Sequence, residues 1–385
     1  MKAIYLFLSL CLTSMVLFAQ SKSKSRSGAL TQSKVITIPM QADRWEFAPQ
    51  KAEFMTYKNV QGMKLLPKSG PVVLKDFIFS DGTIEFDVEQ TESTFVGVYF
   101  RWQNAMESEF VYLRAQRVNN PKAIDAIQYA PIIGGVNMWD MLPLFQAPAL
   151  IKDKEWNHIK LVVSELQMRV YVNNNAHSTL EIPRLEGNTK QGAIAFEGPA
   201  VYANLVVKPG QIEGLSTTEG IDLTNHDSRY IRSWAVTKPD SLPMGRELLN
   251  VKAFPTKETS WESIQSERQG LVNLTRMYGK SDSRRYVWLK TTIKAKSDLI
   301  RQVRMGFSDE VWVMLNGNPV YVDKNLYGAI LMKPPFGRCS IENTSFTLPL
   351  KAGDNELLIG VANSFYGWGV IARFDNLDDI ELAEK

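Results

Sequence analysis

The stretch IEFDVE, Ile84 to Glu89, alternates strictly between apolar and acidic residues. A period of two is the repeat of a β-strand, because successive side chains of a strand point to opposite faces of the sheet. Ile84, Phe86 and Val88 should therefore face a hydrophobic core. The three acids should project together from the other face.

Short alternating segments of the same kind recur from residue 35 onward, separated by Gly, Asn, Pro and Asp. Before residue 210 no segment has a convincing helical period. The run Asn173–Asn175 suits a hairpin turn that requires positive φ. This pattern predicts an antiparallel β-sandwich, built from the segments 84–89, 96–102, 111–114, 158–164, 167–175, 192–196 and 201–207.

A second series of strand-like segments follows residue 220, so the fold class is all-β, with two antiparallel jelly-roll sandwiches in tandem. In the segment 309–315 apolar residues occupy both parities, which predicts a strand buried on both faces. Asn316-Gly317 should form the tight turn after it, and Pro319 should restrict the next strand to a sheet edge or a bulge. The least regular part is 239–283, where we expect a short helix near 262–270.

The chain is predicted to divide into five parts by composition and pattern. These parts are a signal peptide (1–19), a disordered leader (20–34), a first sandwich (35–208), a polar linker (209–219) and a second sandwich (220–385).

The N-terminus has the composition of a secretory signal. Lys2 precedes an apolar run that closes on Ala19, which places the expected cleavage near Ala19/Gln20. The run is too short to predict a membrane span, and none is expected in the mature chain. We therefore predict a secreted or periplasmic protein.

Charge and composition argue against several kinds of partner. The formal net charge of +3 becomes +2 once the predicted signal peptide is removed, and no basic run suggests nucleic acid. His158, His177 and His226 are not at metal-ligand spacing, so no metal site is predicted. No cofactor is expected, although the turns Asp354-Asn355 and Asp375-Asn376 could hold a structural calcium ion.

Cysteine usage excludes a disulfide framework. The mature chain would retain only Cys339, so it cannot form an intramolecular disulfide. A lone thiol is more often a buried small hydrophobic group than a nucleophile, and we expect Cys339 to be buried.

Residues 35–208 resemble the concanavalin A-like sandwich of lectins, glucanases and laminin-G domains. The resemblance rests on FSDGTIEFDVE, FVGVYFRW, EFVYLRA, WNHIKLVVSELQMRVYVNN and GAIAFEGPAVYANLVV. Residues 220–385 resemble a galactose-binding-like jelly roll of the kind appended to secreted glycosidases, through YIRSWAVTKPDS, FSDEVWVMLNGNPVY, LPLKAGDNELLIGV and SFYGWGVIARFDN. The resemblance implies glycan binding on a concave sheet, and in some members glycoside hydrolysis.

The acids Glu85, Asp87 and Glu89 allow two interpretations. They could supply the nucleophile and the acid/base of a retaining glycosidase, whose carboxyl groups stand about 5 Å apart. Alternatively, they form ion pairs with Arg101 and Arg114 on neighbouring strands. We predict the ion pairs, and no catalytic residue.

The predicted ligand-binding residues combine aromatic rings with planar polar groups, which together recognise the C–H faces and hydroxyls of sugars. Trp139 lies in the long Gly/Pro-rich loop 128–149 and could instead cap the core, as could Phe145. The ligand-binding set is Tyr99, Arg101, Tyr112, Arg114, Gln128 and Trp139.

The motif SFYGWG (364–369) contains three aromatic residues that a period-two strand cannot bury together. We expect Trp368 to lie in the core and at least one of Phe365 and Tyr366 to be exposed.

The sequence thus predicts a secreted binder of poly- or oligosaccharides that serves as an accessory in polysaccharide recognition or processing. A glycoside hydrolase and a structural or interaction protein are the alternatives.

Overall fold

The computed structural model describes residues 34–250 and 253–382. The predicted signal peptide, and the leader up to residue 33, lie outside the described residues. The predicted boundaries at 35–208, 209–219 and 220–385 stay predictions.

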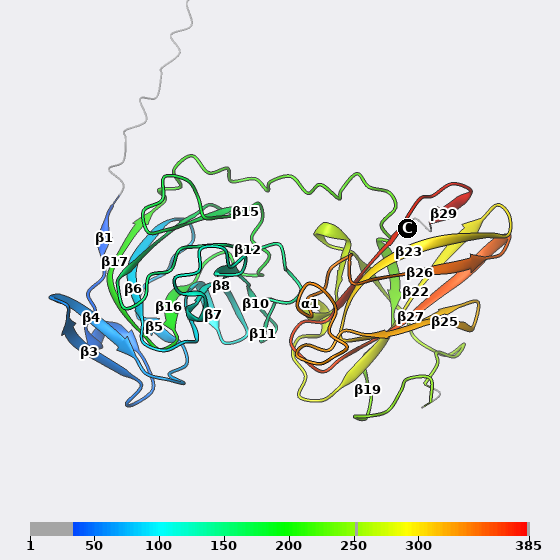
Figure 1. The fold of residues 1–385 in the computed structure, drawn as a ribbon, viewed down its shortest axis with the longest axis horizontal. Coiled ribbons are helices and arrows are strands. Elements are labelled where there is room, and N and C mark those ends of the chain that lie inside the picture. Colours follow the sequence, from blue (N-terminus) through cyan, green and yellow to red (C-terminus); the bar gives the residue numbers. More distant parts are fainter. Residues whose placement is uncertain (1–33, 251–252, 383–385) are drawn as a thin grey trace, which may run out of the picture. The chain divides into compact units, whose positions relative to one another are not determined.

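The described residues fold almost entirely into antiparallel strands, so the predicted all-β class is confirmed (Figure 1). Each of four sheets draws its strands from only one of two groups, β1–β17 or β18–β29. The first group consists of β1 (Ile36–Thr37), β2 (Trp45–Glu46), β3 (Ala52–Tyr57), β4 (Val60–Leu65), β5 (Val72–Leu74), β6 (Gly82–Gln90), β7 (Phe95–Asn104), β8 (Glu107–Arg114), β9 (Ile127–Tyr129), β10 (Ile132–Ile133), β11 (Val136–Asn137), β12 (Gln146–Ala147), β13 (Asn157–Val163), β14 (Met168–Val172), β15 (Leu180–Ile182), β16 (Ala193–Glu197) and β17 (Ala200–Pro209). The second consists of β18 (Ser233–Val236), β19 (Asp240–Ser241), β20 (Glu262–Gln265), β21 (Leu271–Asn273), β22 (Arg285–Ala295), β23 (Leu299–Ser308), β24 (Glu310–Leu315), β25 (Asn318–Lys324), β26 (Thr344–Leu350), β27 (Gly353–Asn363), β28 (Gly369–Phe374) and β29 (Ile380–Leu382).

The strand of the IEFDVE stretch, β6, lies in the middle of the first sheet, whose order is β15-β14-β13-β6-β17-β4-β3. Ile84, Phe86 and Val88 are buried in the core between this sheet and the second, of order β11-β10-β8-β7-β16-β5-β2. The prediction that these three residues face a core is confirmed. The acids alternate with them and point away from that core.

A β-bulge interrupts the alternation of β7. Arg101 has a φ of 51°, and the register with both β8 and β16 shifts beside it. The extra residue turns Arg101 inward, and Trp102 takes the outward face beside Tyr99, where the two ring centroids are 5.0 Å apart. Strict alternation along residues 96–102 would place Arg101 outward with Tyr99 and Trp102 inward with Phe100, and the bulge reverses both positions.

The inward Arg101 is 2% exposed and connects the two sheets of the first group. Its Nε donates to the Ser80 carbonyl at 2.9 Å, and its Nη2 donates to the Ser164 carbonyl at 2.9 Å. Nη2 also donates to the Asp81 carboxylate at 3.0 Å, and the Glu165 carbonyl is a further acceptor. A buried guanidinium is tolerated because its donors are met in this way.

In the second group β22, β27 and β24 form the middle of a sheet of order β20-β18-β22-β27-β24-β25. The β24–β25 turn has positive φ at Asn316 and Gly317, 51° and 77°, which confirms the predicted hairpin turn. Pro319 lies on the edge strand, as predicted. Trp312 is 1% exposed, which confirms burial on both faces.

The irregular part of the sequence covers the outer face of this sheet. Leu242, Leu248 and Trp261 pack there against Trp312 and Met314. The fourth sheet, β21-β28-β23-β26, closes the other face around a second core.

The helix expected near 262–270 is not found at that position. Those residues form β20 and a single 3-10 turn at Arg268–Gly270, and α1 follows at Leu274–Tyr278. The side chain of Asn273 accepts from the Arg276 N–H and caps α1, a signal that lies just outside the predicted window.

Replacing Arg101 with Ala should destabilise the protein by about 3–5 kcal/mol, because the buried carbonyls and Asp81 lose their donor. Chemical denaturation measures this loss. The matched control is Arg169→Ala, whose ion pair with Glu181 is 3.6 Å long and largely exposed, and which should cost about 0–1 kcal/mol. Equal effects of the two substitutions would contradict the structural role of Arg101.

Candidate functional site

The acids of β6 have partners other than the predicted ones. Glu85 pairs with Lys208 at 2.7 Å, and Asp87 with His158 at 2.8 Å. Glu89 accepts from Lys58 at 2.6 Å and from Tyr57 at 2.7 Å. The prediction of ion pairs is correct in kind, but Arg101 and Arg114 as partners are wrong, because they belong to the other sheet.

The Asp87–His158 pair is tightly hydrogen-bonded. Burial alone would raise the pKa of Asp87, but hydrogen bonds from His158 and Asn204 lower it. The hydrogen bond to Asp87 raises the pKa of His158 in turn. These contacts hold Asp87 ionised. The acids of β6 thus serve to bind other side chains of the protein.

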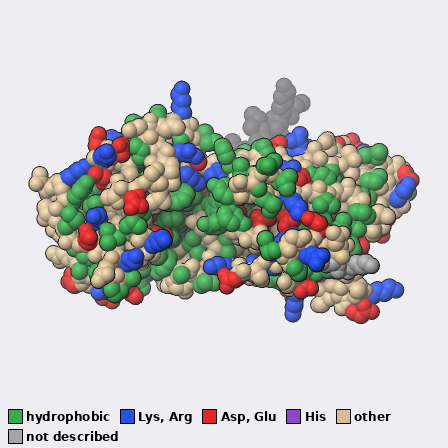
Figure 2. All heavy atoms as spheres, turned by 60° about the horizontal axis from the view of Figure 1, so that its bottom comes forward, with side chains coloured by type: hydrophobic (Ala, Val, Ile, Leu, Met, Phe, Trp, Pro, Cys, Tyr) green, Lys and Arg blue, Asp and Glu red, His purple; other side chains and the backbone are tan. Residues whose placement is uncertain are grey.

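The main concavity lies over the outer face of β7 and β8, and we call it the aromatic cleft. Its volume is about 1010 Å³. Figure 2 shows hydrophobic side chains gathered in a hollow on one face of the protein. The aromatic residues that line the cleft are Phe95, Tyr99, Trp102, Phe110, Tyr112, Trp139, Tyr327, Phe336, Phe365 and Tyr366.

The floor of the cleft is a row of stacked rings. The ring centroids of Tyr99 and Phe110 are 4.0 Å apart, and those of Phe110 and Tyr112 are 5.2 Å apart. These residues alternate with the core residues of β7 and β8, so a second hydrophobic cluster forms on the outer face of the sheet. The row is rigid because each ring is held by the next.

The walls are more open than the floor. Tyr327 is 53% exposed and Tyr366 is 49% exposed. Trp139 is half-buried between them, with ring centroids 5.0 Å from Tyr327 and 5.8 Å from Tyr366, both in edge-to-face geometry. Trp139 thus keeps part of its surface free, whereas Phe145 is buried in the core.

A buried amide holds the floor and the wall together. Gln128 donates from Nε2 to the Trp139 carbonyl at 2.8 Å and accepts from the Tyr112 hydroxyl at 2.9 Å. Its Oε1 also accepts from Arg114. Gln128 is fully buried, so it positions cleft residues and does not touch the cleft itself.

Four of the six predicted ligand-binding residues line the aromatic cleft: Tyr99, Tyr112, Arg114 and Trp139. Gln128 lies beneath it, and the bulge turns Arg101 away from it into the core. Ligand binding by the four stays a prediction.

Sequence reasoning missed the wall that comes from the second group of strands. Tyr327, Phe336 and Arg338 lie in the turn-rich segment between β25 and β26, where no periodicity marks them. Phe365 and Tyr366 were marked by the surplus of aromatics in SFYGWG, and both are exposed as expected. Trp368 is fully buried in the second core, which confirms its prediction.

The loop that carries Phe365 and Tyr366 is held by two buried carboxyl groups. Asp140 accepts the Gly367 N–H on both oxygens, at 3.2 and 3.1 Å. Asp309 accepts the N–H groups of Ser364 at 2.7 Å and of Phe365 at 3.0 Å. A Cβ at Gly367 would lie 2.2 Å from a Met141 atom, so the loop approaches as closely as only glycine permits.

Burial raises the pKa of Asp140 to about 8, and the neighbouring charge of Asp309 adds to this shift. Burial likewise raises the pKa of Asp309 to about 7. Both groups are therefore hydrogen-bonding acids that are easily protonated near neutral pH.

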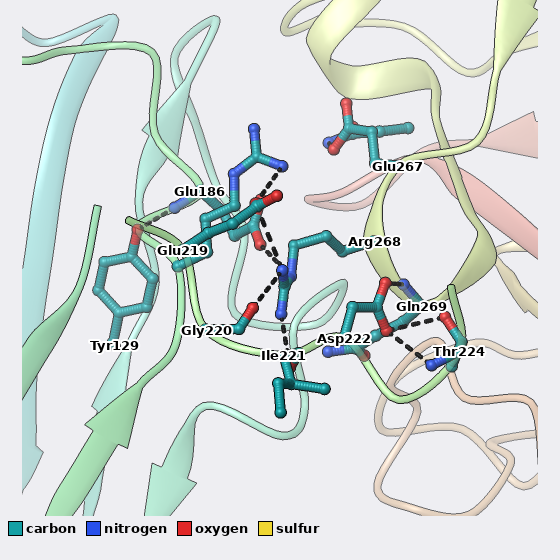
Figure 3. A network of polar contacts seen from close by, with 12 residues as sticks. Tyr129, Glu186, Glu219, Gly220, Ile221, Asp222, Thr224, Glu267, Arg268 and Gln269 are labelled. Carbon is teal, nitrogen blue, oxygen red and sulfur yellow. Dashed lines mark hydrogen bonds and ion pairs between the residues drawn. The ribbon is translucent and has the colours of Figure 1, made fainter. Parts of the chain in front are cut away.

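A separate polar network fixes the segment that follows β17 (Figure 3). Arg268 donates to the carbonyls of Gly220 at 3.0 Å and Ile221 at 2.9 Å. The Nε of Arg268 also lies 3.8 Å from the Glu186 carboxylate. The backbone N–H of Glu186 donates to the Tyr129 hydroxyl. Burial raises the pKa of Glu186 to about 7, so this carboxyl belongs to a structural network beneath the surface.

The remaining predicted features concern metals, the thiol and the membrane. Cys339 is buried, as expected, and burial raises the pKa of its thiol. Among residues 34–250 and 253–382 no cluster of three or more His, Cys, Asp or Glu side chains could hold a metal ion. In the same residues no helix has the length and apolar character to cross a membrane.

No protein-family model and no curated protein sequence matches the chain. Among solved structures, the chain is similar to a carbohydrate-binding module, CBM66, from Bacillus subtilis, at 11% identity over 43% of this chain and 95% of that one, with a TM-score of 0.32. A β-glucanase from Bacillus licheniformis is 8% identical over 47% of this chain and 100% of that one, with a TM-score of 0.31. The exoplasmic/lumenal domain of VIP36, in a form bound to Ca²⁺ and Man3GlcNAc, is 11% identical over 51% and 94%, with a TM-score of 0.32. Similarities of this size carry no conclusion about ligand or activity.

Asp140 should make the stability of the protein depend on pH. Its folded pKa lies above its ordinary value of 3.8, so the folded state binds the proton more tightly than the unfolded state. The stability it contributes is fully present below about pH 4 and is lost as the pH rises to about 8, at roughly 1 kcal/mol per pH unit.

Asp140→Asn should flatten this slope, measured by urea denaturation at intervals between pH 4.5 and pH 8. The exposed substitution Asp153→Asn is the matched control and should leave the slope unchanged. An unaltered slope in Asp140→Asn would show that Asp140 does not bind the proton in this range.

Proposed function

We propose that the aromatic cleft binds a poly- or oligosaccharide, and that the protein is an exported accessory in polysaccharide recognition or processing. The observation that carries this proposal is the composition of the cleft lining. Partly exposed rings such as Trp139, Tyr327 and Tyr366 lie in the same concavity as Arg114, Arg117 and Asn137. Aromatic faces pack on sugar C–H groups, and planar polar groups hydrogen-bond to hydroxyls.

The size of the cleft supports a ligand larger than one sugar. Pockets for drug-sized ligands span about 300–1,000 Å³. At about 1010 Å³ the aromatic cleft reaches the top of that range and offers room for several sugar units. Its walls are exposed rings, so a chain could enter and leave at its ends.

The pairing of the acidic side chains at the cleft favours a protein that binds a glycan without cleaving it. Two acidic side chains, Asp125 and Glu197, are among the residues found to line it. Asp125 pairs with Arg117 at 2.8 Å, and Glu197 accepts the Tyr99 hydroxyl. A glycosidase places two carboxyl groups on either side of the scissile bond, whereas each of these two side chains is engaged by a partner from the protein. The acids of β6 lie on the other sheet and are paired as well.

Trp139→Ala should weaken retention on a glycan array at least tenfold, because it removes a half-buried ring from the cleft wall. Its melting temperature should change by no more than a few degrees. The matched control is Trp156→Ala, another half-buried tryptophan, which packs edge-to-face on Tyr57 at a centroid distance of 5.7 Å, outside the cleft lining. That variant should bind as the wild type does.

If wild-type protein retained no glycan, the proposal would fail. If Trp139→Ala lowered the melting temperature as strongly as it lowered glycan retention, Trp139 would be a core residue. Release of reducing ends from an array hit by the wild type would instead support the hydrolase alternative.

A further inference from the structure

The charges of three guanidinium groups, those of Arg114, Arg117 and Arg338, all act on Asp125, and we call these groups the guanidinium cluster. All three line the cleft. Arg338 is 2% exposed and Arg114 is 7% exposed, so two of the charges are largely removed from water. Arg114 comes from β8, whereas Arg338 comes from the segment between β25 and β26.

Within residues 34–250 and 253–382, the guanidinium cluster forms ion pairs with one carboxylate, that of Asp125. Asp125 lies 2.8 Å from Arg117 and 3.7 Å from Arg114. Burial alone would raise the pKa of Asp125, but the arginines lower it, so Asp125 is an ionised partner. It is one carboxylate among three guanidiniums. Asp140 contributes little charge at neutral pH, because its pKa is raised to about 8.

Arg338 itself is incompletely satisfied. One terminal nitrogen, Nη1, donates to Gln146 Oε1, and Nε is buried without a partner. Within the described residues, the other terminal nitrogen, Nη2, donates to no protein acceptor, and the Arg338 side chain lines the cleft. Burial and the charge of Arg114 both lower the pKa of Arg338, which reflects the cost of holding this cation here.

We propose that the guanidinium cluster binds an oxyanion carried by the ligand, so that the preferred ligand is an acidic glycan bearing uronic carboxylates or sulfate esters. This inference rests on the proposed function of the cleft. Arginine has the planar, charged donor set that suits a carboxylate or a sulfate. An anion bound at Nη2 would supply the missing acceptor and the missing charge together.

The neighbouring ring gives the acidic sugar a place to pack. The Arg338 guanidinium carbon is 5.5 Å from the centroid of the Trp139 ring. A pyranose that contacts Trp139 would therefore hold its acidic group within reach of Arg338. Ring and cation together distinguish an acidic sugar from a neutral sugar of the same shape, because only the acidic sugar also neutralises the charge of the arginine.

The test uses matched pairs of oligosaccharides that differ only in charge. Oligogalacturonates are compared with their carboxyl-reduced forms, and sulfated galactan oligosaccharides with their desulfated forms, by titration calorimetry with the full mature chain. The acidic member of at least one pair should bind at least tenfold more tightly, and this preference should shrink as salt is raised. The pair that shows the preference identifies carboxylate or sulfate as the anion.

Arg338→Met should lower the affinity for the acidic member to that for its neutral counterpart, so that the preference is lost. Arg304→Met is the matched control, because Arg304 on β23 carries the same charge in an exposed ion pair with Glu342. It should retain the full preference. Arg338→Lys keeps the charge but loses the planar donor set, so partial rescue is expected, and melting temperatures verify the folding of all three variants.

Equal affinity for acidic and neutral members, with both weakened by Trp139→Ala, would overturn this inference and leave the sugar-binding cleft in place. An acidic preference that survives in Arg338→Met would overturn the assignment to the cluster. Absence of binding to every member of both pairs would contradict the cleft and the anion together.

Discussion

The buried guanidinium of Arg101 is the constraint on which much of the first group of strands depends. A cation in a β-sandwich core is stable only when carbonyls and a carboxylate surround it. Here the acceptors come from the segment before β6 and from the turn between β13 and β14, whereas Arg101 itself belongs to the opposing sheet. One side chain therefore fixes the distance between two sheets. The positive φ that turns it inward also moves Trp102 to the cleft, so a structural demand in the core shapes the ligand surface.

Strands form the floor of the aromatic cleft, and loops form its opposite wall. Its floor is built on β7 and β8, and hydrogen bonds of Gln128 hold it from beneath. Its opposite wall comes from loops of the second group, which Asp140, Asp309 and a close glycine hold in place. The first hydrophobic core also includes Tyr230, Cys339 and Ile371, so the two groups of strands share packing. A ligand in the cleft contacts residues that are far apart in the sequence.

The period-two pattern predicted the strands, the buried parity of β6 and the tight turn at Asn316-Gly317, because these depend on local geometry. It could not assign strands to sheets. Parity distinguishes inward from outward, but the two outer faces of a sandwich have the same parity, so it cannot separate the acids of β6 from Tyr99, which lie on different sheets. The bulge at Arg101 depends on distant carbonyls, and no local signal marks it. Tyr99, Tyr112 and Arg114 line the cleft because alternation on β7 and β8 is otherwise regular, and Trp139 lines it from the loop between β11 and β12. Tyr327 and Arg338 were missed because they lie in a segment without periodicity.

The position of β6 in its sheet has a consequence for the order in which the chain can fold. Both neighbours of β6 come late in the sequence, since Phe86 pairs with Ile159 and Glu89 pairs with Val201. During synthesis β6 therefore emerges long before either partner exists, with both hydrogen-bonding edges open. Such distant pairings form slowly, and unpaired edges of this kind invite association with other chains. Before its partner strands are made, the three carboxylates on its outward face make IEFDVE a poor template for another chain. Two such strands paired edge to edge would bring like charges together, and these repel. The alternation that identifies the strand in the sequence thus also protects it before the sheet is complete.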